Sequence, residues 1–278
     1  MSVEKIENNK IKIVALGGLG VDIIKKFDFD NIHGIDTLVL DTDLHALDNV
    51  RISNVMALGL EYAMGLSLNG NVKLGEAIME HSSDSLNEFL KGADFAIAIV
   101  GLGGGFGTGA IQEVVNSIRK FSENTMVIYT IPFSFEGNRR NSISQSVIDN
   151  LKKSNLNVLV EVDSDFFVEH SYDRKDLKQT MKNIDNVILE LLYNIIYILE
   201  GESSTDYTKI SETLEKFPGI TFKINSIVEK KKALIEALDN LKTVNRLEDI
   251  IDVDYESIDL NDTSIPSVLR HRKLFQEY

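Results

Sequence analysis

Short apolar segments alternate with longer amphipathic segments through the first half of the chain. Residues 11–16, 95–100 and 126–131 are mostly aliphatic. Runs of this kind are typical of strands in a parallel sheet that is covered on both faces. Apolar residues at helical spacing between the runs predict an α/β fold. Two shorter strands are expected at 37–40 and 158–162, and helices at 21–27, 72–90, 110–121 and 141–153.

The second half of the chain has a different pattern. Apolar residues recur at spacings of three and four over residues 174–199, which predicts one long helix. A strand is expected at 220–228 between helices at 207–216 and 229–241, and the chain is acidic and weakly patterned from residue 242. We therefore divide the chain into an α/β domain at 1–173, a central helix at 174–200, a reduced α+β C-terminal region at 201–243 and a flexible tail at 244–278.

The composition excludes several classes of function. Lys and Arg total 29 against 43 Asp and Glu, so the net charge is −14 and nucleic acid is not an expected partner. Cysteine is absent, which excludes disulfides, a thiol nucleophile and Cys-ligated zinc. The five histidines are scattered, so no metal site is expected. No run reaches the roughly 18 apolar residues of a membrane span, and we expect a cytoplasmic protein without direct membrane insertion.

The strongest chemical signal is the glycine-rich segment at 101–109 (GLGGGFGTG), between an apolar run and a predicted helix. Glycine tolerates positive φ, so successive N–H groups in such a loop can surround an anion, and the helix N-terminus adds a partial positive charge. The segment therefore predicts a cradle for a diphosphate or triphosphate. The alternative is a tight turn in which glycines only permit close packing. Neither the P-loop motif nor the dinucleotide fingerprint is present.

The segment GGGFGTG resembles the GGGTGTG loop of the tubulin/FtsZ family. Further segments resemble FtsZ in the same order: VALGGLGVD at 14–22, DTDLHAL at 41–47, GLSLNGNVKLG at 65–75, PFSFEGNRR at 132–140, residues 163–167 and the IDNV of the long helix at 184–187. The resemblance covers roughly residues 11–200. It implies a Rossmann-like GTPase domain, binding of GTP or GDP, head-to-tail assembly with itself or another FtsZ, and a role in cell division.

The resemblance also implies a role for individual residues. Glu136 and Arg140 match the pair that contacts the ribose, and Asp185 matches the acid that reads the guanine edge. Met181 lies where the family stacks a phenylalanine on the base, and Ser164 stands at the base-contacting Asn. Without the resemblance, Glu136 and Arg140 would be an exposed ion pair and Asp185 part of a solvated helix face. The residues matched to the phosphate loops are Gly17, Gly18, Gly20, Gly103, Gly104, Gly105, Gly107, Thr108 and Gly109.

Three substitutions change the expected nucleotide site. Phe106 replaces a threonine in the middle of the phosphate loop. Asp22 and Asp41 each replace an asparagine, and Asp22 remains among the expected nucleotide contacts. Both acids add negative charge near a nucleotide, which weakens binding unless a cation such as Mg²⁺ lies between them.

The largest departure concerns hydrolysis. In FtsZ a loop after the central helix, written NLDFAD, places two carboxylates in the nucleotide site of the next subunit. The matching segment here is EGESSTDYTK at 200–209, and no alignment of it keeps both acids. We expect slow or absent GTP hydrolysis, with Asp206 as the surviving catalytic candidate.

Residues 262–270 (DTSIPSVLR) resemble the terminal peptide of FtsZ, written DIPAFLR, which binds membrane anchors and division regulators. The alternative for this peptide is an ordinary frayed tail without a binding role. Three functions stay open: an FtsZ-like filament protein at the division site, a regulatory paralogue that binds a full-length FtsZ, and a nucleotide-free relative favoured only by Phe106 and the two added acids.

Overall fold

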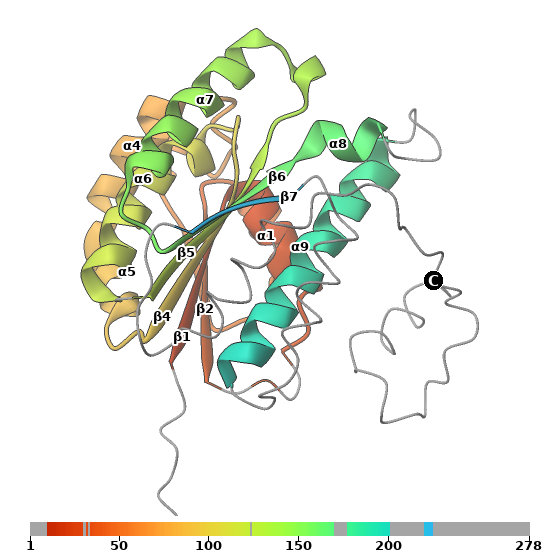
Figure 1. The fold of residues 1–278 in the computed structure, drawn as a ribbon. Coiled ribbons are helices and arrows are strands. Elements are labelled where there is room, and N and C mark those ends of the chain that lie inside the picture. Colours follow the sequence, from red (N-terminus) through yellow and green to blue (C-terminus); the bar gives the residue numbers. More distant parts are fainter. Residues whose placement is uncertain are drawn as a thin grey trace, which may run out of the picture.

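A single twisted sheet organises the part of the chain that the computed structural model describes, residues 10–29, 32, 34–122, 124–169, 177–200 and 220–224. The strand order is β3-β2-β1-β4-β5-β6-β7 (Figure 1). Neighbouring strands are parallel from β3 to β6, and β7 is antiparallel to β6. The strands are β1 (Ile11–Leu16), β2 (Ile35–Asp41), β3 (Asn54–Ala57), β4 (Phe95–Gly101), β5 (Asn124–Ile131), β6 (Val158–Asp163) and β7 (Ile220–Ile224).

Helices cover both faces of this sheet. On one face lie α1, α8 and α9, and on the other lie α4, α5, α6 and α7 (Figure 1). The helices are α1 (Gly17–Lys26), α2 (Leu44–Leu47), α3 (Leu60–Ala63), α4 (Val72–His81), α5 (Ser83–Leu90), α6 (Phe106–Phe121), α7 (Asn138–Lys153), α8 (Ser164–Glu169) and α9 (Leu177–Glu200), with a 3-10 turn η1 at Ser134–Glu136. The predicted α/β fold is confirmed.

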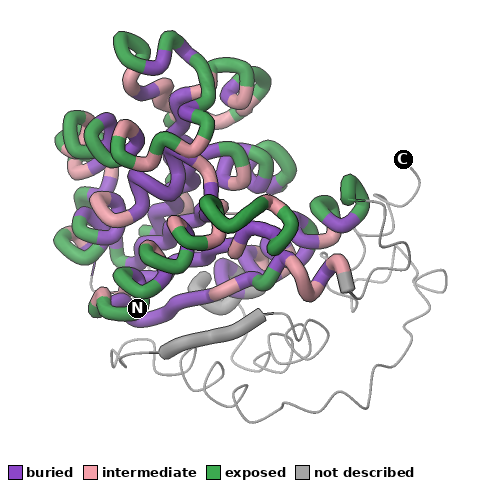
Figure 2. Tube along the Cα trace, turned by 90° about the horizontal axis from the view of Figure 1, so that it is seen from above, coloured by how far each residue is buried: buried purple, intermediate pink, exposed green. Residues whose placement is uncertain are grey.

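Two apolar cores lie on opposite faces of the sheet because side chains alternate along each strand. In β1, Ile13 and Ala15 belong to the core under α1 and α9, whereas Val14 and Leu16 belong to the core under α4 to α7. All four side chains are completely buried. Figure 2 shows the buried residues in the interior and the exposed residues along the outer sides of the helices. Burial on both faces explains the continuous apolar runs in the sequence.

Some elements differ from the sequence-based expectation. The helix expected at 72–90 is two helices, α4 and α5, which meet at Ser82. The expectation missed β3, an edge strand whose residues are only partly buried and therefore lack a continuous apolar run. The described strand at 220–224 pairs with β6 and extends the same sheet. The helices expected at 207–216 and 229–241, and the tail from 244, lie outside the described residues.

No helix within the described ranges combines the length and the apolarity needed to cross a membrane.

The close approach of α4 and α6 depends on glycine. A Cβ atom on Gly109, in α6, would collide with the carbonyl oxygen of Val72 and lie 2.6 Å from the backbone nitrogen of Glu76, both in α4. Gly75 faces this contact from α4, where a Cβ atom would lie 2.6 Å from the carbonyl oxygen of Gly105. Backbone atoms cannot move aside as side chains do, so these positions exclude any larger residue.

We therefore expect Gly109→Ala to destabilise the fold by about 1–3 kcal/mol, the usual cost of overpacking a close contact. The matched control is Gly104→Ala in the preceding loop, because a Cβ atom there meets nothing within 4 Å and φ is not positive. Its free energy of unfolding should stay within about 0.5 kcal/mol of the unchanged protein. Urea unfolding of both variants measures the difference, and equal midpoints would contradict the packing role of Gly109.

Candidate functional site

The two glycine-rich loops lie side by side at one edge of the sheet. Strands β1 and β4 are parallel neighbours, with Leu16 opposite Val100 at their carboxyl ends. The chain leaves β1 into α1 on one face of the sheet and leaves β4 into α6 on the other face. Such a reversal is a topological switch point, where doubly wound α/β proteins bind their ligands.

The first loop is a sharp turn from β1 directly into α1. Gly17 begins the helix with φ +65°, a conformation that side chains rarely adopt. No side chain caps this helix, and its first turn contains no acidic residue. A Cβ atom on Gly17 would lie 3.4 Å from the backbone nitrogen of Gly107, so the two loops are in contact here.

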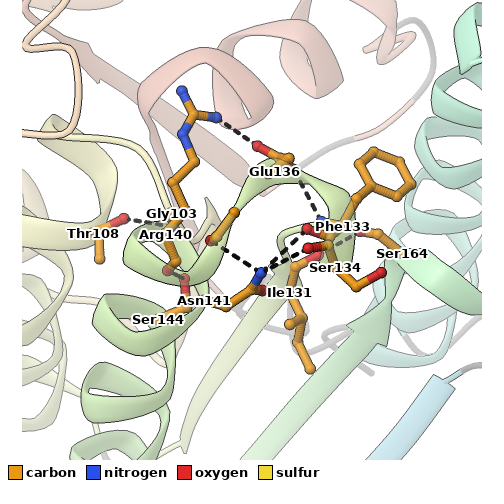
Figure 3. A network of polar contacts seen from close by, with 11 residues as sticks. Gly103, Thr108, Ile131, Phe133, Ser134, Glu136, Arg140, Asn141, Ser144 and Ser164 are labelled. Carbon is orange, nitrogen blue, oxygen red and sulfur yellow. Dashed lines mark hydrogen bonds and ion pairs between the residues drawn. The ribbon is translucent and has the colours of Figure 1, made fainter.

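The second loop connects β4 to α6 and is braced from within. Gly103 has φ +96°, and its N–H donates to the hydroxyl of Thr108 at 2.9 Å (Figure 3). Thr108 is buried, so its side chain stabilises the turn rather than projecting outward. No side chain caps α6. The first N–H groups of an α-helix have no partner within the helix, so α1 and α6 both present donors at this edge.

The glycines of the two loops fall into two geometric groups. Gly18 and Gly104 face open space, because a Cβ atom on either would meet nothing within 4 Å. At Gly20, a Cβ atom would lie 2.8 Å from the backbone of Ala15, which is the close helix–strand packing of the alternative reading. Gly105, Gly107 and Gly109 also approach neighbouring atoms closely. The close-packing alternative therefore applies to some of these glycines, whereas Gly18 and Gly104 leave space that a ligand could occupy.

Phe106 does not obstruct the loop in which it replaces threonine. The side chain is buried in the apolar core under α6, in the cluster that also contains Leu68, Ile78 and Leu102. The ring therefore points away from the open space beside Gly104 and fills the core. Phe106, one of the three substitutions that favoured a nucleotide-free relative, therefore has a role in packing.

Glu136 and Arg140 form a braced pair beyond the carboxyl end of β5. One carboxylate oxygen of Glu136 accepts the N–H of Phe133 at 2.9 Å, and the other pairs with the guanidinium of Arg140 (Figure 3). The side chain of Arg140 is half exposed, so its remaining donors face solvent. The sequence named this pair, but it gave no sign of Asn141, whose amide donates to the carbonyls of Phe133, Ser134 and Gly137.

Ser164 joins the ends of two strands. Its hydroxyl donates to the carbonyl of Ile131 at 2.5 Å, which ties the start of α8 to the end of β5 (Figure 3). The neighbouring Asp165 accepts the N–H of Ser134. Both contacts fix the loop that carries Glu136, and the sequence singled out only Ser164 of the two residues.

Asp185 is the buried acid of the site. It lies on α9, is 8% exposed, and pairs with the ammonium group of Lys26 on α1 at 2.5 Å. Burial raises the pKa of Asp185, the charge of Asp22 raises it further, and the contact with Lys26 lowers it. Met181, one turn earlier on α9, is 56% exposed and offers an apolar surface near the acid. The sequence reasoning missed Lys26, which stands 159 residues from its partner.

Asp41 ends β2 close to this region. It is 5% exposed, and one carboxylate oxygen accepts the N–H groups of Thr42 at 2.7 Å and Asp43 at 3.3 Å. Burial raises the pKa of Asp41, and the charges of Asp43 and Asp22 add to this effect. Among the described residues, no three or more His, Asp or Glu side chains are grouped so as to hold a metal ion. A Mg²⁺ ion here would therefore take most of its ligands from phosphate oxygens and water rather than from protein side chains.

The catalytic candidate Asp206 lies outside the described residues. The phosphate, ribose and base assignments remain predictions from resemblance. The structure does bring the two glycine loops, the Glu136–Arg140 pair and Ser164 to one edge of the parallel sheet, because they follow β1, β4, β5 and β6.

The fold and these loops define a doubly wound α/β protein with two glycine turns at its switch point. The chain belongs to the Tubulin/FtsZ family, whose GTPase-domain model matches residues 10–169, more than half of the chain. The predicted family is thereby confirmed.

Individual relatives agree with this assignment. The chain is 36% identical over 188 residues to the cell division protein FtsZ of Mycoplasmopsis pulmonis, covering 64% of this chain and 48% of that protein. It is 26% identical over 209 residues to the FtsZ of Aquifex aeolicus, covering 74% of this chain and 57% of that protein. The chain thus spans about half the length of these curated relatives.

Solved structures agree on the fold. An empty FtsZ dimer of M. jannaschii matches with a TM-score of 0.66 at 23% identity, covering 76% of this chain and 62% of that one. CetZ2 from Haloferax volcanii, a GTPγS-bound protofilament, matches with a TM-score of 0.62 at 18% identity, covering 73% of this chain and 62% of that one.

The raised pKa of Asp41 leads to a stability prediction. At neutral pH its ionisation opposes folding, and the amide oxygen of asparagine can accept the same two N–H groups. We expect Asp41→Asn to raise the free energy of unfolding at neutral pH by about 1 kcal/mol. The gain should shrink as the pH falls and vanish below 3.8, the ordinary pKa, because the carboxyl group is then protonated in both the folded and unfolded states.

Urea unfolding at several pH values measures this effect. Asp48→Asn is the matched control, since that side chain is 62% exposed and its replacement removes the same charge. A stability gain that is equal for both variants would reflect net charge alone and contradict the role of burial.

Proposed function

We propose that this chain is an FtsZ-like protein that binds guanine nucleotide and assembles head-to-tail with copies of itself in cell division. One observation carries the nucleotide proposal: two uncapped helix N-termini, α1 and α6, meet at the switch point beside the open positions Gly18 and Gly104. Backbone donors of this kind can hold phosphates without basic side chains, so a net charge of −14 is no obstacle.

The neighbouring side chains suit the rest of a guanine nucleotide. Arg140 and Glu136 offer a guanidinium and a carboxylate for sugar hydroxyls, and both are partly exposed. Asp185 offers carboxylate oxygens that can accept two adjacent N–H donors, which guanine presents and adenine does not. The exposed Met181 supplies a polarizable surface for the base.

Exposed apolar side chains support assembly. The large ones within the described residues gather at the carboxyl edge of the sheet, the edge that carries the nucleotide site. Isolated exposed apolar residues are normal, but a concentration at one end of a protein is typical of an interface. A second copy that covers this edge would also enclose the nucleotide. These side chains are Leu44 after β2, Leu60, Tyr62, Met64 and Leu66 after β3, Phe135 after β5, and Leu177 and Met181 at the start of α9.

Weak hydrolysis is part of the proposal. When the segment at 200–209 is aligned to match Asp206 with one acid of the family loop, no acid stands at the position of the other, so the water-positioning pair of the family is incomplete. The same observation favours a second candidate function, a regulatory paralogue that co-assembles with a full-length FtsZ. In either case residues 262–270 are the proposed contact for a membrane anchor or division regulator, and the cytoplasmic division site is the proposed location.

Nucleotide binding is tested with a fluorescent GTP analogue and purified protein. We expect saturable binding that GTP displaces and ATP does not. Gly104→Ala should weaken binding about tenfold or more, because the added methyl group projects into the open space assigned to the phosphates. Its thermal unfolding midpoint should match that of the unchanged protein, which separates the site from the fold. Lack of binding by the unchanged protein would exclude the proposed function. Full affinity of Gly104→Ala would show that the phosphates do not bind beside Gly104.

Assembly and turnover are measured together by sedimentation and phosphate release with GTP. We expect GTP-dependent pelleting, and we expect Met64→Glu to abolish it because a charge at an 80% exposed interface position must lose water on assembly.

Phosphate release should be slow, and Asp206→Asn should remove the remaining GTP hydrolysis. A protein that pellets only when mixed with a full-length FtsZ would favour the regulatory function. Rapid turnover that survives Asp206→Asn would contradict the hydrolysis proposal.

A further inference from the structure

A side-chain contact between Lys26 and Asp185 links α1, which follows the first glycine loop, to the proposed guanine-binding acid on α9. The ammonium group of Lys26 meets one carboxylate oxygen of Asp185 at 2.5 Å. The lysine side chain is 43% exposed, whereas that of Asp185 is 11% exposed. The pair therefore lies at the boundary between solvent and the α1–α9 contact, with the acid on the inner side.

The contact leaves the carboxylate able to bind a base. A carboxylate has about four lone-pair positions, of which a lysine contact uses one. A guanine edge needs two, for its N1–H and its exocyclic amino group. Lys26 and a guanine base can therefore share Asp185 without competing for the same positions.

The charges around Asp185 make its ionisation depend on Lys26. Burial and the negative charge of Asp22 both favour the protonated form. Lys26 is the cation that opposes them, and it lies one turn from Asp22 on α1. The other helix that packs on α9, α8, carries Asp165, whose carboxylate is held by the N–H of Ser134. A protonated Asp185 would turn an O–H towards one of the guanine donors and lose that hydrogen bond.

A separate contact holds the two helices together. Just beyond the end of α1, the ring of Phe27 stacks on that of Tyr193 with 4.5 Å between the ring centroids, and the N–H of Asp28 donates to the Tyr193 hydroxyl at 2.6 Å. Because these contacts do not involve Lys26, removal of its charge should leave α1 packed on α9.

We propose that Lys26 is a positioning residue for base selectivity, which holds Asp185 ionised and oriented so that it accepts both N–H donors of guanine. This inference rests on the proposed binding of guanine nucleotide at the switch point. Lys26 acts through Asp185 and needs no contact with the nucleotide.

The test compares GTP with ITP, which lacks the exocyclic amino group, between about pH 6 and about pH 8. In the unchanged protein GTP should bind more tightly than ITP. Lys26→Met should reduce that preference about tenfold, the scale of one hydrogen bond to a charged group. The loss should be largest at low pH and recover as the pH rises, because the pKa of Asp185 increases further when the cation is removed. Lys26→Arg should restore the preference.

Two further variants sharpen the result. Lys25→Met removes the same charge from the neighbouring position, where the ammonium group donates to the carbonyl of Ala46, and it should leave the GTP-to-ITP ratio and its pH dependence unchanged. Asp185→Asn should lose the preference, and Lys26→Met added to it should cause no further loss.

The outcomes separate the two proposals. A Lys26→Met protein that keeps a full GTP preference with a flat pH profile overturns the inference. So does an equal loss of GTP and ITP affinity that arginine does not restore, since that result describes a packing role alone. If the unchanged protein binds neither nucleotide, the proposed function fails and the inference fails with it.

Discussion

The parallel pairing of β1 with β4 is the constraint on which the rest of the site depends. It brings two turns, separated by more than eighty residues of sequence, to one edge of the sheet. Because their helices depart to opposite faces, the N-termini of α1 and α6 meet at that edge without blocking each other. The helices pack on both faces of the sheet, with α1 and α9 on one side and α4 to α7 on the other, and this packing holds α1 and α6 in place.

Glycine serves this constraint in two ways that sequence alone cannot separate. Gly109 and Gly20 allow backbones to approach within distances that no side chain permits, Gly109 between α6 and α4 and Gly20 between α1 and β1. Gly18 and Gly104 leave space above those loops. The glycine-rich motifs therefore contain two kinds of position, those that permit close backbone packing and those that face open space.

The sequence predicted the fold well where burial leaves a periodic record. The strands of the doubly buried sheet and the long helix α9 are visible as apolar runs and as three-and-four spacing. Elements without such a record were missed, including the partly buried edge strand β3 and the break at Ser82. The candidate site followed from motifs, but its supporting residues Asn141 and Asp165 did not, because each acts through a loop fold that only the three-dimensional structure defines. The burial of Phe106 could not be predicted for a related reason: sequence gives the size of a side chain, not the side of the loop on which it lies.

The acidic residues that replace asparagine show how one charge can require another. Asp22 places a negative charge near Asp185 and near Asp41, and both of these acids are buried. In both acids burial is the main cause that raises the pKa, and the charge of the exposed Asp22 adds to it. One turn along α1 from Asp22, Lys26 supplies a cation that lowers the pKa of Asp185. The lysine side chain is 43% exposed and that of Asp185 only 11%, so the acid is the more strongly desolvated partner. Within the part of the chain that the structure describes, no cation pairs with Asp41, and its carboxylate accepts the N–H groups of Thr42 and Asp43 instead. Lys26 thus offsets part of the effect that burial and Asp22 have on Asp185, whereas the N–H groups of Thr42 and Asp43 do so at Asp41.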